Sequence, residues 1–174
     1  FSFTENSFEE LVKVNSSDPA SYSLSGPDAA AFSISNSGII TFNFPPDYET
    51  KNTYNINVEV SDGTLSTSQA ININIVNISE SPVINSPANS ISYNENATTS
   101  VVSVNATDSD EGTVFNYSLS GADASALSIS NAGVITFNSS PDFETKNSYS
   151  FVIEVSDGQN NTSQAQIINI INVD

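Results

Sequence analysis

The stretch TYNINVEVSDG at residues 53–63 alternates apolar and polar side chains with a period of two. Its apolar positions are Tyr54, Ile56, Val58 and Val60. Because successive side chains of a strand point to opposite faces, this pattern predicts a strand with one buried face and one solvated face. A second copy, SYSFVIEVSDG, stands 95 positions further along, at residues 148–158.

The repetition extends over the whole chain. The offset of 95 also carries YSLSG at 22–26 onto 117–121, and PDYETKN at 46–52 onto PDFETKN at 141–147. Near the start of each unit the offset is 90, since FSFTEN at 1–6 matches ISYNEN at 91–96, so the second unit has five extra residues in or beside 108–116. The sequence predicts two tandem units, residues 1–80 and 81–174. Pro82 and Pro87 favour an extended connection between them.

Each unit is predicted to be all-β. The segments GIITFNF at 38–44 and GVITFN at 133–138 begin strands after Asn-x-Gly turns. Several short strands separated by Gly, Pro, Asn and Asp, within about 90 residues, are typical of a β-sandwich. The only helix-like stretches, at 26–32 and 121–127, are too short for more than about two turns.

The charge balance excludes several classes of function. The 174 residues include 20 acids and 3 lysines, which gives a net charge of -17. This surplus repels nucleic acids and anionic membranes, and three lysines cannot neutralise it. Without Cys or His, the chain has no disulfides, no usual zinc or copper ligands and no Ser-His or Cys-His catalytic pair. This composition is compatible only with hard, oxygen-preferring metals.

The chain has no apolar run near the ~20 residues that a membrane-spanning helix needs. Its first residues, FSFTENS, lack the features of a secretion signal and already read as a strand. We therefore expect the chain to be a piece of a longer protein.

Three motifs, repeated in the same order, resemble the cadherin repeat, especially its bacterial cadherin-like form. They are a Glu-Asn pair early in each unit, an Asp-x-Glu motif and a late Ser-Asp-Gly; their residues are Glu5-Asn6 and Glu95-Asn96, Asp47-Tyr48-Glu49 and Asp142-Phe143-Glu144, and Asp62 and Asp157. The resemblance covers both units almost from end to end. It implies two seven-stranded Greek-key sandwiches of immunoglobulin-like architecture, with calcium at the junction between the repeats.

The resemblance also implies which residues hold the calcium. From the first unit and the linker they are Glu5, Asp47, Glu49, Asn77 and Glu80. From the second unit they are Asp108, Asp110 and Asp157. A half-site for a following repeat is implied at Glu95, Asp142, Glu144, Asn172 and Asp174. The linker Asn77-Ile78-Ser79-Glu80-Ser81-Pro82 departs from the acidic run of animal cadherins, which implies fewer or weaker ions.

The chemistry of these residues agrees with calcium, which takes about 6–8 oxygen ligands in a flexible geometry. If Asp47 and Glu49, or Asp108 and Asp110, lay in extended strands, residues i and i+2 would place two carboxylates side by side. Without a cation this arrangement is expected to raise their pKa values. The alternative is that these acids belong to ordinary solvated turns and loops.

The sequence thus favours a calcium-rigidified tandem module of an extracellular or cell-surface adhesin, which acts structurally and not as an enzyme. Its expected partners are adjacent repeats, with other copies of the chain or a surface ligand as further possibilities. Two alternatives remain open: a self-assembling subunit of an extracellular filament or surface layer, and a carbohydrate-binding sandwich. The last usually needs exposed aromatic rings, whereas most of the 6 Tyr and 10 Phe stand at core-like positions.

Overall fold

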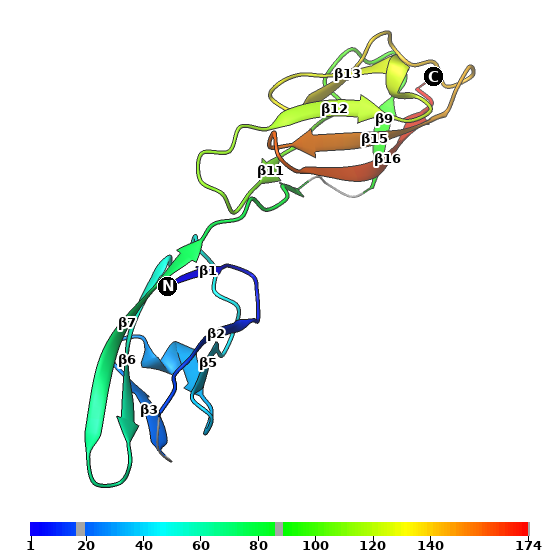
Figure 1. Ribbon diagram of the computed structural model, residues 1–174. Helices are drawn as coiled ribbons and strands as arrows, with labels where there is room; N and C mark the ends of the chain where they lie inside the picture. Colours follow the sequence, from blue (N-terminus) through cyan, green and yellow to red (C-terminus); the bar gives the residue numbers. More distant parts are fainter. Residues whose placement is uncertain (17–19, 86–88, 174) are drawn as a thin grey trace. The chain divides into compact units, whose positions relative to one another are not determined.

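The computed structural model describes residues 1–16, 20–85 and 89–173 (Figure 1). The chain divides into two compact units, Phe1–Ile78 and Ser79–Asp174. The boundary lies after residue 78, whereas the sequence analysis places it after residue 80. Pro87, one of the two linker prolines, lies outside the described residues.

The first unit contains a four-stranded and a three-stranded sheet. The larger sheet has the order β1 (Ser2–Thr4), β7 (Ser66–Val76), β6 (Thr53–Ser61), β3 (Ser21–Ser25). The smaller has the order β2 (Glu10–Lys13), β5 (Ile39–Phe42), β4 (Phe32–Ile34). Among the described strands of this unit only β1 pairs in parallel, with the end of β7, and Figure 1 shows β6 and β7 as one long hairpin.

The second unit repeats this arrangement. Its larger sheet has the order β12 (Asn116–Ser120), β15 (Ser148–Ser156), β16 (Asn161–Ile171), β9 (Ser90–Asn94). Its three-stranded sheet has the order β10 (Val102–Ser103), β14 (Val134–Phe137), β13 (Leu127–Ile129). The short strands β8 (Val83–Ile84) and β11 (Ala106–Thr107) form an additional antiparallel pair.

The predicted all-β class is confirmed. Among the described residues the only helical segments are two short 3₁₀ turns, η1 (Ala29–Ala31) and η2 (Ala124–Ala126), which lie in the two stretches noted in the sequence. Along the chain of each unit, the strands cross several times between the two sheets, while in the first unit β4 and β5 stay in the smaller sheet and β6 and β7 in the larger one. The number of seven strands per unit stays a prediction.

Apolar side chains at alternating strand positions form the core of each unit. In β6, Ile56 and Val58 are buried while Asn57 and Glu59 are exposed, and in β7 the buried residues are Ile71, Ile73 and Ile75. Phe32 and Phe42 from the smaller sheet pack against each other, with ring centroids 4.3 Å apart. The period-two pattern therefore correctly predicted the buried face.

Gln166 interrupts this pattern in the second core. It occupies the position of Ile71 in the first unit, is 1% exposed, and neither its amide nitrogen nor its amide oxygen has a hydrogen-bond partner among the described residues. A buried polar group without a partner destabilises a fold by about 1–3 kcal/mol.

We therefore expect Gln166→Ile to stabilise the second unit by about 1–3 kcal/mol, because it removes the unsatisfied amide and restores the residue found in the first repeat. Urea denaturation of both proteins measures the difference. Ile71→Gln is the matched control and should destabilise the first unit. A loss of stability in Gln166→Ile would contradict the interpretation.

The same ion pair lies beside the core of each unit. Lys51 pairs with Asp28 and lies 4.9 Å from the ring centroid of Tyr54, while the other oxygen of Asp28 accepts a hydrogen bond of 2.7 Å from Asn55 N–H. Lys146, Asp123, Tyr149 and Ser150 repeat this arrangement. The lysine hydrogen bond is the main cause that lowers the pKa of each aspartate below its ordinary value, and the backbone hydrogen bond adds to it.

These two aspartates predict a pH dependence of stability. Because their folded-state pKa values are lowered, their contribution is present above the unfolded-state value near 3.8 and is lost as the pH falls below it. In chelator, Asp28→Asn with Asp123→Asn should lower the melting temperature at pH 7 and reduce its decline below about pH 4. Thermal melts from pH 7 to pH 2 test this, and parallel curves for the two proteins would contradict it.

Candidate metal centre

Three carboxylates converge at the end of the first unit where β7 finishes. Oxygens of Glu5, Asp47 and Glu49 all lie within 4.8 Å of one another. Glu5 follows β1, while Asp47 and Glu49 belong to the turn after Pro46. Asn77 joins them, since its side-chain amide donates a hydrogen bond of 2.7 Å to Oε1 of Glu49. All four predicted residues of the first unit are thus brought together.

Glu5 is the buried member of this set, at 2% exposure. Its Oε2 accepts a hydrogen bond of 2.7 Å from Tyr48 N–H, and its Oε1 accepts one of 2.6 Å from Ile78 N–H. Glu5 therefore fixes both the Asp47–Glu49 turn and the chain that leaves β7. The motif resemblance implies Glu5 only as a ligand, and nothing in the sequence indicates this structural role.

The geometry of Asp47 and Glu49 differs from the extended arrangement expected from the sequence. They lie in a turn, in which Thr50 donates its N–H to Oδ1 of Asp47 over 3.1 Å and its hydroxyl to Oδ2 over 2.8 Å. These hydrogen bonds, the side-chain one first, lower the pKa of Asp47, so the predicted rise is wrong at this residue. Asp108 and Asp110 also lie outside a strand.

The second unit has the same set at its corresponding end. Oxygens of Glu95, Asp142 and Glu144 lie within 4.8 Å of one another, and the Asn172 amide donates to Glu144 over 2.9 Å. Glu95 accepts hydrogen bonds from Phe143 N–H at 3.1 Å and Val173 N–H at 2.8 Å. The Thr145 hydroxyl is the main cause that lowers the pKa of Asp142. Asp174, also predicted here, lies outside the described residues.

A different group of acids lies at the start of the second unit. Oδ1 of Asp108 accepts a hydrogen bond of 3.0 Å from Asp110 N–H, and Oδ2 of Asp110 accepts one of 3.2 Å from Glu80 N–H. Oδ1 of Asp157 accepts two, from Gln159 N–H at 2.6 Å and from Asn160 N–H at 2.5 Å. The Asn160 hydrogen bond is the main cause that lowers the pKa of Asp157.

Two carboxylate oxygens in this group are candidate cation ligands. Oδ2 of Asp108 and Oδ2 of Asp157 are buried, and neither has a hydrogen-bond partner among the described residues. A buried carboxylate oxygen without a partner is costly, and a divalent cation compensates that cost directly. The donors are all oxygens, which are the ligands that calcium prefers.

Asn160 is a linker-binding residue that no motif in the sequence indicated. Its side-chain amide donates to the carbonyl oxygens of Ser79 and Glu80, over 2.9 and 2.8 Å, and thereby holds the linker against the second unit. The corresponding residue of the first unit is Leu65. This difference between otherwise similar repeats is the signal that could have identified Asn160.

Comparisons with known proteins point to one family. Residues 89–173 match the cadherin domain family. The chain is 31% identical over 155 residues to the Fat-like cadherin-related tumor suppressor homolog of Drosophila melanogaster, and 33% identical over 144 residues to protocadherin Fat 4 of Homo sapiens. These matches cover 86% and 76% of the chain but only 3% of either relative. Both relatives are animal proteins, so they do not support the bacterial form of the repeat.

Solved structures share the fold. The human protocadherin-24 EC1-2 structure covers 99% of this chain and 94% of its own, with a TM-score of 0.67 and 22% identity. The mouse cadherin-23 EC22-24 structure covers 99% of this chain and 62% of its own, with a TM-score of 0.64 and 21% identity.

Two further findings bear on the class of protein. Members of the cadherin domain family are adhesion proteins and not enzymes. In the part of the chain that the structure describes, no helix has the length and apolar character needed to cross a membrane.

Because residues 89–173 match its family model, the second unit belongs to the cadherin domain family. The first unit repeats the sequence motifs and the sheet order of the second.

Proposed function

We propose that this chain is a calcium-binding tandem repeat module of an extracellular adhesion protein, with a structural and adhesive role. The observation that carries the proposal is the pair of buried, unpartnered oxygens on Asp108 and Asp157 beside the linker. The relatives, which carry cadherin and protocadherin names, support the extracellular and cell-surface location. Adjacent repeats are the first partners that we propose.

Covalent connectivity supports a shared site. Ile78 N–H binds Glu5 of the first unit, and Glu80 N–H binds Asp110 of the second. Two residues of chain span at most about 7 Å, so a short stretch of backbone connects the N–H groups that Glu5 and Asp110 bind. We propose that one calcium cluster takes ligands from both groups, namely Glu5, Asp47, Glu49, Asn77, Glu80, Asp108, Asp110 and Asp157.

Protonation does not oppose this binding. Hydrogen bonds keep the pKa values of Asp47 and Asp157 below their ordinary range, so both side chains are carboxylates at neutral pH. Calcium therefore displaces no proton from them, and its affinity should change little between about pH 6 and pH 8.

Calcium supplies the charge that brings the two groups of acids together. An ion that binds the aligned units more tightly than the flexed ones shifts the population toward a straight, stiff module. The stabilisation follows RT ln(1 + [Ca]/Kd), which is about 2.7 kcal/mol at 100 times Kd. Glu95, Asp142, Glu144, Asn172 and Asp174 form the equivalent half-site for a following repeat in this proposal.

The alternative functions have less support. Self-assembly into a filament or surface layer stays a prediction. Phe8 and Phe44, at 74% and 80% exposure, show that not all aromatic rings lie in the cores, but phenylalanine alone offers no hydrogen bond to a sugar. Carbohydrate binding also stays a prediction.

Titration calorimetry of the whole chain tests the proposal. We expect calcium to bind with a dissociation constant of about 10⁻⁴–10⁻³ M, as in other extracellular modules. Magnesium should bind more weakly, because it requires a tighter octahedral geometry than this carboxylate-rich set provides. The absence of calcium binding at several millimolar, or equal binding of the two ions, would contradict the proposal.

A further inference from the structure

Two phenylalanine side chains are exposed on neighbouring segments of the first unit. Phe8 is 74% exposed and Phe44 is 80% exposed. The segments that carry them run side by side, because β2 pairs with β5 and the Asn6 N–H donates a hydrogen bond of 2.9 Å to the Pro46 carbonyl. Phe8 and Phe44 each lie between these two points of pairing, so both rings belong to the same part of the surface.

The second unit forms the same local structure without these rings. The repeat offsets place Thr98 and Ser139 at the two positions, and both residues border one depression there. The backbone pairing is the same, since the Asn96 N–H donates to the Pro141 carbonyl, also over 2.9 Å. The fold of the repeat therefore does not require phenylalanine at either position.

The difference between the units extends to charge. Residues 8–10 read Phe-Glu-Glu, whereas their counterparts at 98–100 read Thr-Thr-Ser. Residues 44–45 read Phe-Pro, whereas their counterparts at 139–140 read Ser-Ser. Apolar and acidic residues thus replace polar ones together, on the same part of the first unit. These five residues are called here the aromatic–acidic patch: Phe8, Glu9, Glu10, Phe44 and Pro45.

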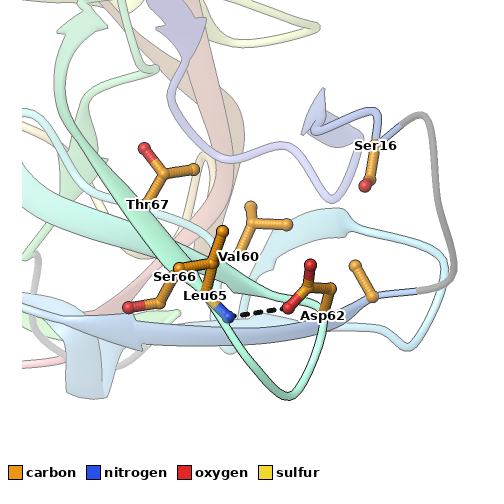
Figure 2. Close-up of a pocket in the computed structure, with 7 residues that line it drawn as sticks. Ser16, Val60, Asp62, Leu65, Ser66 and Thr67 are labelled. Atoms are coloured by element: carbon orange, nitrogen blue, oxygen red, sulfur yellow. Dashed lines mark hydrogen bonds between the residues drawn. The ribbon is translucent and has the colours of Figure 1, made fainter.

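The two acids of the patch are available to a ligand. Glu9 and Glu10 are exposed, and their carboxylates have no hydrogen-bond or ion-pair partner among the described residues. Asp62 of the same unit shows the contrast, since Figure 2 shows its carboxylate bound to the Leu65 N–H within the β6–β7 turn. The patch therefore offers two exposed rings beside two carboxylates that no cation of the described chain neutralises.

We propose that the aromatic–acidic patch binds an arginine-bearing segment of a partner protein. The planar guanidinium group stacks on the exposed faces of Phe8 and Phe44, and the carboxylates of Glu9 and Glu10 neutralise its charge. Arginine suits both contacts better than lysine, because lysine is a compact, strongly hydrated charge that does not stack.

Charge selects a basic partner over a second copy of this chain. The sequence contains no arginine, its three basic residues are lysines, and Lys51 and Lys146 already pair with aspartates. With a net charge of -17, two copies repel each other and attract a cationic segment. The patch residues are not among the proposed calcium ligands, so this binding does not depend on the calcium cluster.

An NMR titration of the full chain with synthetic peptides tests the proposal. The probe is an acetylated and amidated peptide with the sequence GRLRLG, and its analogues are GKLKLG and GELELG. We expect GRLRLG to shift the amide signals of residues 8–10 and 44, and to bind about threefold more tightly than GKLKLG. The acidic peptide should leave these signals unchanged. The result should be the same in calcium and in chelator.

Two loss-of-binding variants separate the rings from the charges. Phe8→Thr with Phe44→Ser introduces the residues of the second unit, and should weaken GRLRLG binding about fivefold without lowering stability in urea. Glu9→Gln with Glu10→Gln keeps both rings, and should weaken binding and remove most of its dependence on salt. Leu65→Ser removes a side chain that is 74% exposed outside the patch, and should leave binding unchanged.

The second unit allows the converse experiment. The variant Thr98→Phe, Thr99→Glu, Ser100→Glu and Ser139→Phe places the patch on the second repeat, where the same backbone pairing occurs. This variant should bind a second GRLRLG peptide, with new shifts at residues 98–100 and 139.

Each other outcome overturns the proposal. Equal shifts with GELELG would show that the patch does not select a cation. Unchanged affinity in Phe8→Thr with Phe44→Ser would show that the net charge alone attracts the peptide. Sedimentation that shows a dimer of the wild type but not of this variant would assign the patch to a second copy. Unchanged signals at millimolar GRLRLG would show that the patch does not bind arginine.

Discussion

Replacing Asp108 and Asp110 together with alanine is expected to abolish most of the stabilisation that calcium gives to the chain. The double variant removes Oδ2 of Asp108, which is buried without a partner among the described residues, and the carboxylate that accepts Glu80 N–H. At 100 times Kd the wild-type gain is about 2.7 kcal/mol, and most of it should be lost. Denaturation with urea, in calcium and in chelator, measures the gain for each protein.

The matched control for this variant is Glu9→Ala with Glu10→Ala. Both residues are exposed, and their replacement removes the same charge from the first unit. Calcium should stabilise this control as much as the wild type. If both double variants lost the calcium effect equally, calcium would act by general screening of the charge of -17 and not at a site.

Glu5→Ala should destabilise the first unit by about 2–4 kcal/mol even without calcium. The change removes the carboxylate that accepts the N–H groups of Tyr48 and Ile78, and a hydrogen bond to a charged group contributes about 1.5–3 kcal/mol. Urea denaturation in chelator tests this expectation. In calcium the variant should also bind the ion more weakly.

Glu49→Ala serves as its control, because Glu49 belongs to the same set of acids but is exposed. Changes at exposed positions usually stay within about 0.5 kcal/mol, so in chelator this variant should be nearly as stable as the wild type. Equal losses in the two variants would contradict the distinction between a structural and an exposed carboxylate.

The parts of the fold that depend on local pattern could be predicted from the sequence. The alternation of Ile56 and Val58 with polar residues, and the repeat offsets of 95 and 90, predicted half-buried strands and two similar units. The repeat offsets are found by comparing the two halves of the sequence directly. The alternation arises from neighbouring residues along one strand, because the strand period is fixed by backbone geometry. The shortness of η1 and η2 was visible for the same reason.

The features that the sequence missed depend on residues far apart along the chain. Glu5 accepts N–H groups of Tyr48 and Ile78, which are 43 and 73 positions away, and no local pattern contains that information. The approach of Asp47 and Glu49 comes from a turn stabilised by Thr50, not from strand alternation. Gln166 stands at a position that the alternation along its strand places in the core. Only the packed structure shows that its amide has no hydrogen-bond partner among the described residues.

The resemblance of the motifs to the cadherin repeat indicated candidate site residues that the alternation of apolar and polar side chains could not indicate. Within the first unit Glu5, Asp47, Glu49 and Asn77 come together as the resemblance implies. The difference between Leu65 and Asn160 was equally present in the sequence. Its meaning required the structure, because only there does Asn160 contact the linker backbone.

The stiffening of the module by calcium is tested most directly by ¹⁵N relaxation of the two units in solution. In calcium at about ten times Kd or more, the amides of both units should report one common, slower tumbling time. In chelator each unit should tumble faster and with its own time. Identical relaxation in calcium and in chelator would contradict the proposal that calcium couples the two repeats.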